Sequence, residues 1–169
     1  MKKVFGITGW KNSGKTTLVA SLVREFTGRG LSVSTVKNAS EQFDIDHPQT
    51  DSHAHRLAGA QEVAIVSPKR WALMHELTNN VAPPSLDEMI AKLAPCDLVL
   101  VEGFKSAPHP KIECVRDTSK EDSPIWTTNE SIVAVASPAP VESGSLPRLD
   151  LNNIPEIANF IVEETGLSL

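Results

Sequence analysis

The sequence is poor in cysteine, and its two thiols form neither a metal-binding nor a disulfide pattern. Cys96 and Cys114 are the only ones, and no C-x-x-C spacing occurs. Isolated cysteines of this kind behave as small apolar groups. We therefore expect both to be buried hydrophobic residues at the edges of strands.

The chain also lacks an excess of positive charge and any long apolar run. Lys and Arg number 16 against 21 acidic residues and form no basic stripe, which argues against a nucleic-acid partner. No stretch reaches the roughly 18 apolar residues of a membrane-spanning helix, so no membrane association is expected. The apolar run after Met-Lys-Lys breaks at Gly6 and Gly9. We therefore expect no signal peptide and a cytoplasmic protein.

What the sequence does contain is a regular alternation of strand and helix patterns. Its length predicts one domain over residues 1–169. The alternation predicts a three-layer α/β fold with a largely parallel central sheet and some antiparallel strands. The expected strands are 3–8, 31–37, 61–67, 97–102, 110–116 and 131–136, with 71–75 antiparallel to 61–67; the expected helices are 15–28, 51–59, 85–94 and 155–165; the expected loops are 38–50, 78–84 and 137–147.

Residues 9–16, Gly-Trp-Lys-Asn-Ser-Gly-Lys-Thr, are a complete G-x-x-x-x-G-K-[ST] phosphate loop between a strand pattern and a helical pattern. Gly9 and Gly14 let the backbone curl so that successive amides face phosphate oxygens, and the helix adds its positive end. Lys15 is expected on the β- and γ-phosphates, and the Thr16 hydroxyl on Mg²⁺. The sequence therefore predicts a nucleotide-binding site in a P-loop NTPase-like fold.

A second part of this site is expected where the strand at 97–102 ends. Four consecutive apolar residues there are followed by Glu102 and Gly103. Such a run indicates a strand buried on both faces, and ligands bind at the carboxyl ends of strands in an open α/β sheet. We expect Glu102 to hold Mg²⁺ directly or through water; the alternative is a solvated acid at a strand end.

Charged residues after the second expected strand are further candidates. Asp46 and Asp51, and less strongly Asp44, are placed to reach the metal, although Asp51 can instead stabilise the start of a helix. Lys37, at the tip of the strand, is a candidate for the γ-phosphate or else an ordinary surface lysine.

The residues do not distinguish ATP from GTP, because the Asn-Lys-x-Asp element of many GTP-binding proteins is absent. No Gln or Arg finger and no hydrolytic base is recognisable, so unaided hydrolysis is expected to be slow. Trp10 is expected to pack either on neighbouring structure or on the nucleotide.

Several segments together resemble the molybdopterin-guanine dinucleotide biosynthesis adaptor family, MobB, over nearly the whole chain. The most specific are Val-Glu-Gly-Phe-Lys at 101–105 and Arg-Trp-Ala-Leu-Met at 70–74; the others are 7–18, 44–46 with 51–52, 56–60 and 132–135. The chain departs from the family pattern after Lys37, where Asn38-Ala39-Ser40 stand in place of histidines, and before Asp51, where Gln49-Thr50 stand in place of Gly-Lys.

This resemblance implies a small GTP-binding protein that assists a partner guanylyltransferase, the enzyme that joins GMP to molybdopterin. It also implies a homodimer, dependence on Mg²⁺ and weak GTP hydrolysis. The phosphate loop carries over directly, so the implied nucleotide contacts are Gly9, Trp10, Lys11, Asn12, Ser13, Gly14, Lys15, Thr16 and Thr17, with Thr16 also a metal contact.

Two other functions stay open from the sequence. An ATP-dependent ligase or kinase resembling dethiobiotin synthetase would place Lys37, Asp51 and Glu102 comparably and transfer phosphate to an organic acceptor. A dimeric platform would bind the pterin or the partner enzyme and use nucleotide only to stabilise its fold.

Overall fold

The structure is a computed structural model that describes residues 2–39, 43–77, 81–116 and 123–168. Contacts divide the chain into two compact units. The larger comprises Met1–Asn38 with Leu86–Leu169, and the smaller comprises Ala39–Ser85. Each unit is described by itself below, and folding of the chain as a single domain stays a prediction.

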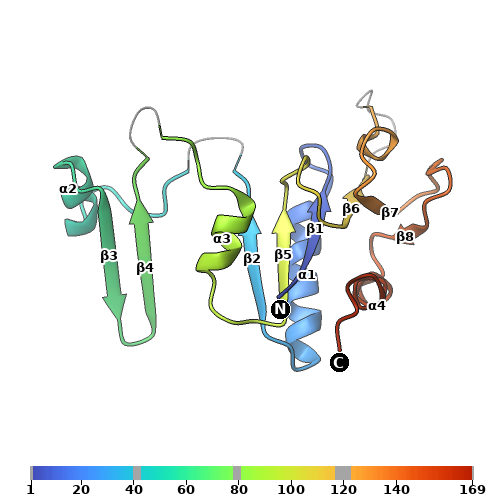
Figure 1. The fold of residues 1–169 in the computed structure, drawn as a ribbon, viewed down its shortest axis with the longest axis horizontal. Helices are drawn as coiled ribbons and strands as arrows, with labels where there is room; N and C mark the ends of the chain where they lie inside the picture. The colour runs from blue at the N-terminus through green and yellow to red at the C-terminus, as the bar shows by residue number, and fades with distance from the viewer. Residues whose placement is uncertain (1, 40–42, 78–80, 117–122, 169) are drawn as a thin grey trace. The chain divides into compact units, whose positions relative to one another are not determined.

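The larger unit is built on a six-stranded sheet in which every neighbouring pair is parallel (Figure 1). The spatial order is β2-β5-β1-β6-β7-β8, so β1 lies between β5 and β6. This arrangement confirms the predicted parallel α/β sheet. The strands are β1 (Lys3–Thr8), β2 (Val33–Lys37), β5 (Leu98–Glu102), β6 (Lys111–Cys114), β7 (Ile132–Ser137) and β8 (Arg148–Asp150).

Helices cover both faces of this sheet, which gives the three layers that the sequence predicts (Figure 1). Strand β5 shows why, because its residues alternate between two apolar clusters. Leu98 and Leu100 pack in a cluster with α1 (Lys15–Gly28) and α4 (Ile154–Thr165). Val99 and Val101 pack in the opposite cluster with α3 (Leu86–Lys92). All five residues of β5 are buried, as a double-sided strand requires.

Helix α1 packs on the sheet through a stripe of apolar residues at helical spacing. Leu18, Leu22 and Phe26 are almost completely buried. Burial of one such side chain contributes roughly 1.5–3 kcal/mol, so the stripe is enough to fix the helix that follows the phosphate loop. The loop is thereby anchored at both ends, by β1 before it and by α1 after it.

The smaller unit is an antiparallel hairpin with one short helix (Figure 1). Strands β3 (Glu62–Ser67) and β4 (Arg70–His75) pair along their full length, which confirms the predicted hairpin. Helix α2 (Asp51–Leu57) begins after Thr50, whose side chain accepts a hydrogen bond from the His53 amide. The unit buries few side chains, among them Val63 and Met74, which lie opposite each other in the hairpin.

Two short elements differ from the expectation. Strand β8 extends the sheet after the predicted loop 137–147, and a 3₁₀ helix, η1 (Ile125–Thr127), follows β6. Residues 40–42 and 78–80, which belong to predicted loops, lie outside the described residues. In the described ranges, no helix is both long and apolar enough to cross a bilayer.

Candidate nucleotide-binding site

The phosphate loop lies at the carboxyl edge of the parallel sheet, between β1 and α1. Its backbone adopts positive φ angles at Gly9 (139°), Asn12 (64°) and Gly14 (96°). Gly14 is the N-cap of α1 and has no side chain to accept from the first helical amides. The first amides of α1 therefore have no side-chain cap, and the positive end of the helix adjoins the loop, as an anion site requires.

Close packing explains why the first position of the motif is glycine. A Cβ on Gly9 would lie 2.5 Å from the Cys114 carbonyl oxygen and 2.6 Å from Ser13 Oγ. The end of β6 thus runs directly along the flank of the loop. Cys114 itself is buried in β6, as predicted, and burial raises the pKa of its thiol to about 12. Cys96, also expected to be buried, is only partly buried, at the edge of the cluster that contains Val99 and Val101.

Lys15 is folded back onto the phosphate loop. Its ammonium donates hydrogen bonds to the Trp10 carbonyl oxygen and, at 3.4 Å, to Ser13 Oγ. Burial lowers the pKa of Lys15, and the nearby Lys105 and Lys37 lower it further, while Cys114 and Glu102 oppose this. An anion bound in the loop would relieve that repulsion.

Thr16, Lys37 and Glu102 form one polar cluster beside the loop. Thr16 Oγ1 donates to Glu102 Oε1 at 2.8 Å. The Lys37 ammonium lies 3.1 Å from the same carboxylate oxygen and 3.5 Å from Thr16 Oγ1. Lys37 and Glu102 are register partners at the ends of β2 and β5, and Glu102 is buried. The structure therefore brings together three residues that the sequence singles out separately.

This cluster suits a magnesium ion held jointly with a nucleotide. Mg²⁺ prefers oxygen ligands and is usually bound by one or two carboxylates together with phosphate oxygens and water. Thr16 and Glu102 provide a hydroxyl and a carboxylate at the carboxyl edge of the sheet. The Lys37 ammonium shows that Glu102 already pairs with a cation. No group of three or more His, Cys, Asp or Glu residues gathers for a metal in the described ranges. Such a group is not needed where phosphate supplies the other ligands.

Trp10 contacts neighbouring structure, which was one of its two expected settings. Its indole Nε1 donates to the Ser123 carbonyl oxygen at 3.0 Å. The Lys105 ammonium lies 3.6 Å from the ring centroid, a cation–π contact. Of the other predicted loop residues, Ser13 is buried, whereas Lys11, Asn12 and Thr17 are exposed.

Asp46 and Asp51, the two other predicted metal ligands, belong to the smaller unit. Asp46 Oδ1 accepts from Ser52 Oγ at 2.9 Å and from Thr50 Oγ1 at 3.0 Å. Burial acts to raise the pKa of Asp46, but these hydrogen bonds outweigh it and lower the pKa. Asp51 lies in the first turn of α2, where it favours the helix dipole. Both therefore stabilise the start of α2, and metal binding by either stays a prediction.

Three residues near the loop were not singled out from the sequence as site residues. Lys105 covers the Trp10 ring, and Arg116 packs against Gly14. Buried Glu113 accepts hydrogen bonds from the Ile125 amide at 3.2 Å and the Trp126 amide at 2.8 Å, which tethers η1 to β6. Lys105 follows the predicted strand 97–102, and Arg116 is the last residue of the predicted strand 110–116. Position at or just after the end of a strand is the feature that would have pointed to them.

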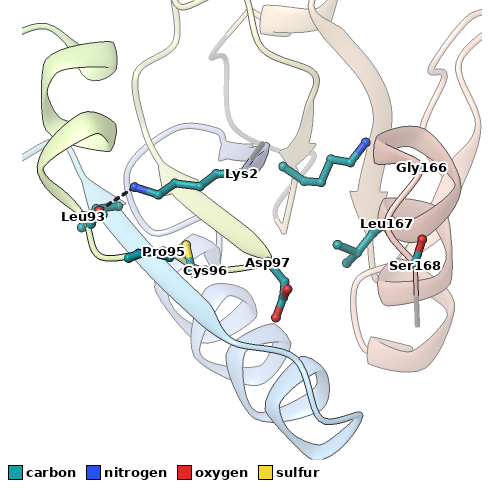
Figure 2. Close-up of a pocket in the computed structure, with 9 residues that line it drawn as sticks. Lys2, Leu93, Pro95, Cys96, Asp97, Gly166, Leu167 and Ser168 are labelled. Carbon is teal, nitrogen blue, oxygen red and sulfur yellow. Dashed lines mark hydrogen bonds between the residues drawn. The ribbon is translucent and has the colours of Figure 1, made fainter.

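A separate cavity of about 500 Å³ lies at the opposite edge of the sheet, where β1 and β5 begin (Figure 2). Two of its charged residues, Lys2 and Asp97, already have protein partners. Lys2 donates to the Ile90 and Leu93 carbonyl oxygens at the end of α3, and Asp97 accepts from the Ser32 amide and hydroxyl. Gly166, which lines the cavity, is the C-cap of α4, so the cavity lies at the carboxyl end of a helix, whereas the phosphate loop lies at the amino end of one.

Known proteins resemble this chain over most of its length. The family model described as molybdopterin guanine dinucleotide synthesis protein B matches residues 4–138. The molybdopterin-guanine dinucleotide biosynthesis adapter protein of Haemophilus influenzae is 38% identical over 94% of this chain and 86% of its own length. The Escherichia coli protein of the same name is 32% identical, over 96% of this chain and 93% of its own.

Solved structures agree with these relatives. A crystal structure of molybdopterin-guanine biosynthesis protein B superposes with a TM-score of 0.71 at 26% identity and covers 95% of this chain and 98% of its own. The structure of a MobB homologue from Bacillus stearothermophilus gives 0.67 at 29% identity with the same coverage. With the family model spanning the phosphate loop, Glu102 and the strands that place them, this chain belongs to the MobB family.

Proposed function

We propose that this protein is a GTP-binding adapter in the biosynthesis of molybdopterin-guanine dinucleotide. The observation that carries the proposal is the phosphate loop with the Thr16–Glu102 pair beside it, at 2.8 Å. The loop supplies main-chain donors and Lys15 for phosphate, and the pair supplies oxygen ligands for Mg²⁺. When Mg²⁺ binds Glu102, we expect the Lys37 ammonium to leave this carboxylate and to pair with a phosphate oxygen instead.

The relatives support the remaining parts of this proposal. Two proteins named as adapters of molybdopterin-guanine dinucleotide biosynthesis are 38% and 32% identical to this chain. A product that contains guanine favours GTP over ATP as the bound nucleotide. An adapter also requires a partner, and a guanylyltransferase that joins GMP to molybdopterin is the partner we propose.

We further propose that the protein is a homodimer, because the hairpin presents an unsatisfied apolar face. Val66 pairs with Trp71 across the two strands, and Leu73 lies on the same face. These side chains are 78%, 72% and 52% exposed, respectively. Contiguous apolar side chains on one sheet face are typical of a protein interface. A second copy of this chain is the partner that the family resemblance favours.

GTP hydrolysis should be slow. The sequence contains no recognisable glutamine or arginine finger that would orient water or stabilise charge at the γ-phosphate. The Glu102 carboxylate already accepts from Thr16 and pairs with Lys37, which suits metal binding rather than proton abstraction. We therefore assign the nucleotide a binding role and at most a weak GTPase activity.

A binding competition tests the proposal. Fluorescent GTP is displaced from the purified protein by GTP or ATP, with and without Mg²⁺. We expect micromolar binding that requires Mg²⁺ and prefers GTP, and Lys15→Ala should abolish it. Arg24→Ala is the matched control, since Arg24 is an exposed cation of α1, about 14 Å along the helix from Lys15.

The opposite results would redirect the assignment. Equal or tighter binding of ATP would contradict the guanine preference. A metabolite that raises nucleotide turnover by orders of magnitude would favour a ligase or kinase resembling dethiobiotin synthetase. Full activation of a molybdoenzyme by the Lys15→Ala variant would instead favour the third function, a dimeric platform in which nucleotide only stabilises the fold.

A further inference from the structure

Arg116, two residues after β6, packs directly on the phosphate loop. A Cβ on Gly14 would lie 3.1 Å from Arg116 Nη2 and 3.2 Å from Nε. The guanidinium therefore lies in close contact with the Gly14 position, and a Cβ there would require it to shift by a few tenths of an ångström. Because Gly14 is the N-cap of α1, the guanidinium lies at the positive end of that helix.

This placement is electrostatically unfavourable in the absence of an anion. A cation at a helix N-terminus is destabilising because the helix dipole places partial positive charge there, and Lys15 adds a second positive charge in the same loop. Within the described part of the chain, no carboxylate forms an ion pair with Arg116. The pKa of Lys15 is lowered, chiefly by burial and also by Lys105 and Lys37. Several cations thus converge on one loop, and a polyanion would neutralise them.

The sheet order indicates which part of a nucleotide Arg116 would meet. Glu102 ends β5, on one side of β1, whereas Arg116 follows β6, on the other side. Thr16 and Glu102 would hold a Mg²⁺ ion that accompanies the nucleotide, and this would draw the γ-phosphate to the β5 side. The α- and β-phosphates would then extend toward β6 and the guanidinium of Arg116.

We infer that Arg116 is a nucleotide-binding residue whose guanidinium contacts the α- and β-phosphates. This inference rests on the proposed nucleotide binding and adds a residue outside the loop motif to that site. The planar guanidinium can donate two parallel hydrogen bonds to phosphate oxygens. Lysine would keep the charge but would lose the paired geometry.

Equilibrium titration of four proteins with three ligands tests the inference. The proteins are wild type, Arg116→Ala, Arg116→Lys and the charge-matched control Arg24→Ala, each checked for folding by circular dichroism. The ligands are GTP, GDP and inorganic pyrophosphate, all with Mg²⁺. Arg116→Ala should weaken GTP and GDP binding equally, by roughly 10- to 100-fold, as expected for loss of a charged hydrogen bond. Arg116→Lys should fall between Arg116→Ala and wild type.

The pyrophosphate titration separates this inference from the proposed function. If wild type binds pyrophosphate through Arg116 but no guanine nucleotide, the nucleotide assignment is wrong and the anion contact of Arg116 stands. Arg116→Ala binding every ligand as tightly as Arg24→Ala would overturn the inference, as would a loss confined to GTP. Failure of wild type to bind any of the three would overturn both.

Discussion

The Glu102 carboxylate and the Lys37 ammonium lie side by side where two neighbouring strands end. The ammonium lies 3.1 Å from the carboxylate, close to the Thr16 hydroxyl that is expected to hold Mg²⁺. Lys37 thus provides the counter-charge that a metal ion would otherwise supply to this buried acid. Metal and lysine should therefore compete for Glu102.

Replacing Lys37 with methionine tests this competition. Loss of the ammonium leaves the Glu102 charge paired only with a hydroxyl, which should lower the free energy of unfolding by about 1–3 kcal/mol without metal. Millimolar Mg²⁺ should restore more thermal stability to the variant than it adds to wild type. Thermal unfolding monitored by fluorescence, with and without Mg²⁺, measures both effects.

Lys37→Met combined with Glu102→Gln is the control, because it removes the carboxylate as well as its partner. Mg²⁺ should then have no extra effect on the melting temperature. An identical Mg²⁺ response in wild type and Lys37→Met would show that lysine and metal do not share Glu102.

His109 should make stability depend on pH. Burial, with a smaller effect from the Lys111 charge, lowers the pKa of His109 from 6.5 to about 4. As pH falls from 6.5 toward 4, the unfolded chain therefore binds a proton that the folded chain does not, and the folded state loses stability. Below about pH 4 this loss is complete.

The measurement is the melting temperature of wild type and His109→Gln between pH 7.5 and 4. Glutamine does not titrate, so the variant should show a shallower decline over this interval. Parallel curves for the two proteins would contradict the lowered pKa of His109.

The start of α4 offers a test at the level of one element. Asn153 is the N-cap of this helix, and its side chain accepts a hydrogen bond from the Glu156 amide at 3.3 Å. Asn153→Ala should lower the free energy of unfolding by about 1 kcal/mol. Asn152→Ala is the neighbouring control and should change it much less. Urea denaturation measures both, and equal losses would argue against the cap.

Elements with strong apolar patterns were predictable, and short ones were not. Strand β5 was expected from four consecutive apolar residues, and all of them are buried. Strand β8 and helix η1 have three residues each, which is too short for a hydrophobic period to be recognised. They form because neighbours hold them: β8 pairs with β7, and Glu113 binds the amides of η1.

The same limit explains which site residues the sequence missed. The phosphate loop is local, so the eight residues of its motif, 9–16, were predicted from spacing alone, whereas Thr17 was added by the family resemblance. The meeting of Arg116 with Gly14 depends on β6 lying next to β1, although these strands are far apart in the chain. Likewise, the partners of Asp46 depend on how the chain folds back at α2. Sequence pattern predicts strand ends but not strand order.

For the molecule as a whole, the apolar face of the hairpin predicts self-association. Val66→Asp places a charge in the centre of that face, beside Trp71, and should shift the protein from dimer to monomer. Ser67→Asp introduces the same charge on the opposite face of β3 and should leave the dimer intact. Sedimentation velocity distinguishes the two states. A monomeric wild type, or a dimeric Val66→Asp variant, would contradict the proposal that the hairpin forms the dimer interface.

The three tryptophans occupy three distinct settings, so the chain contains its own optical reporters. Trp10 lies on the phosphate loop under Lys105, Trp71 lies on the hairpin face, and Trp126 lies in η1. A polyanion that binds the loop, as we propose, would compete with the Trp10 indole for the Lys105 ammonium. A protein that retains Trp10 alone would therefore reveal occupancy of the loop through its emission, without any attached dye.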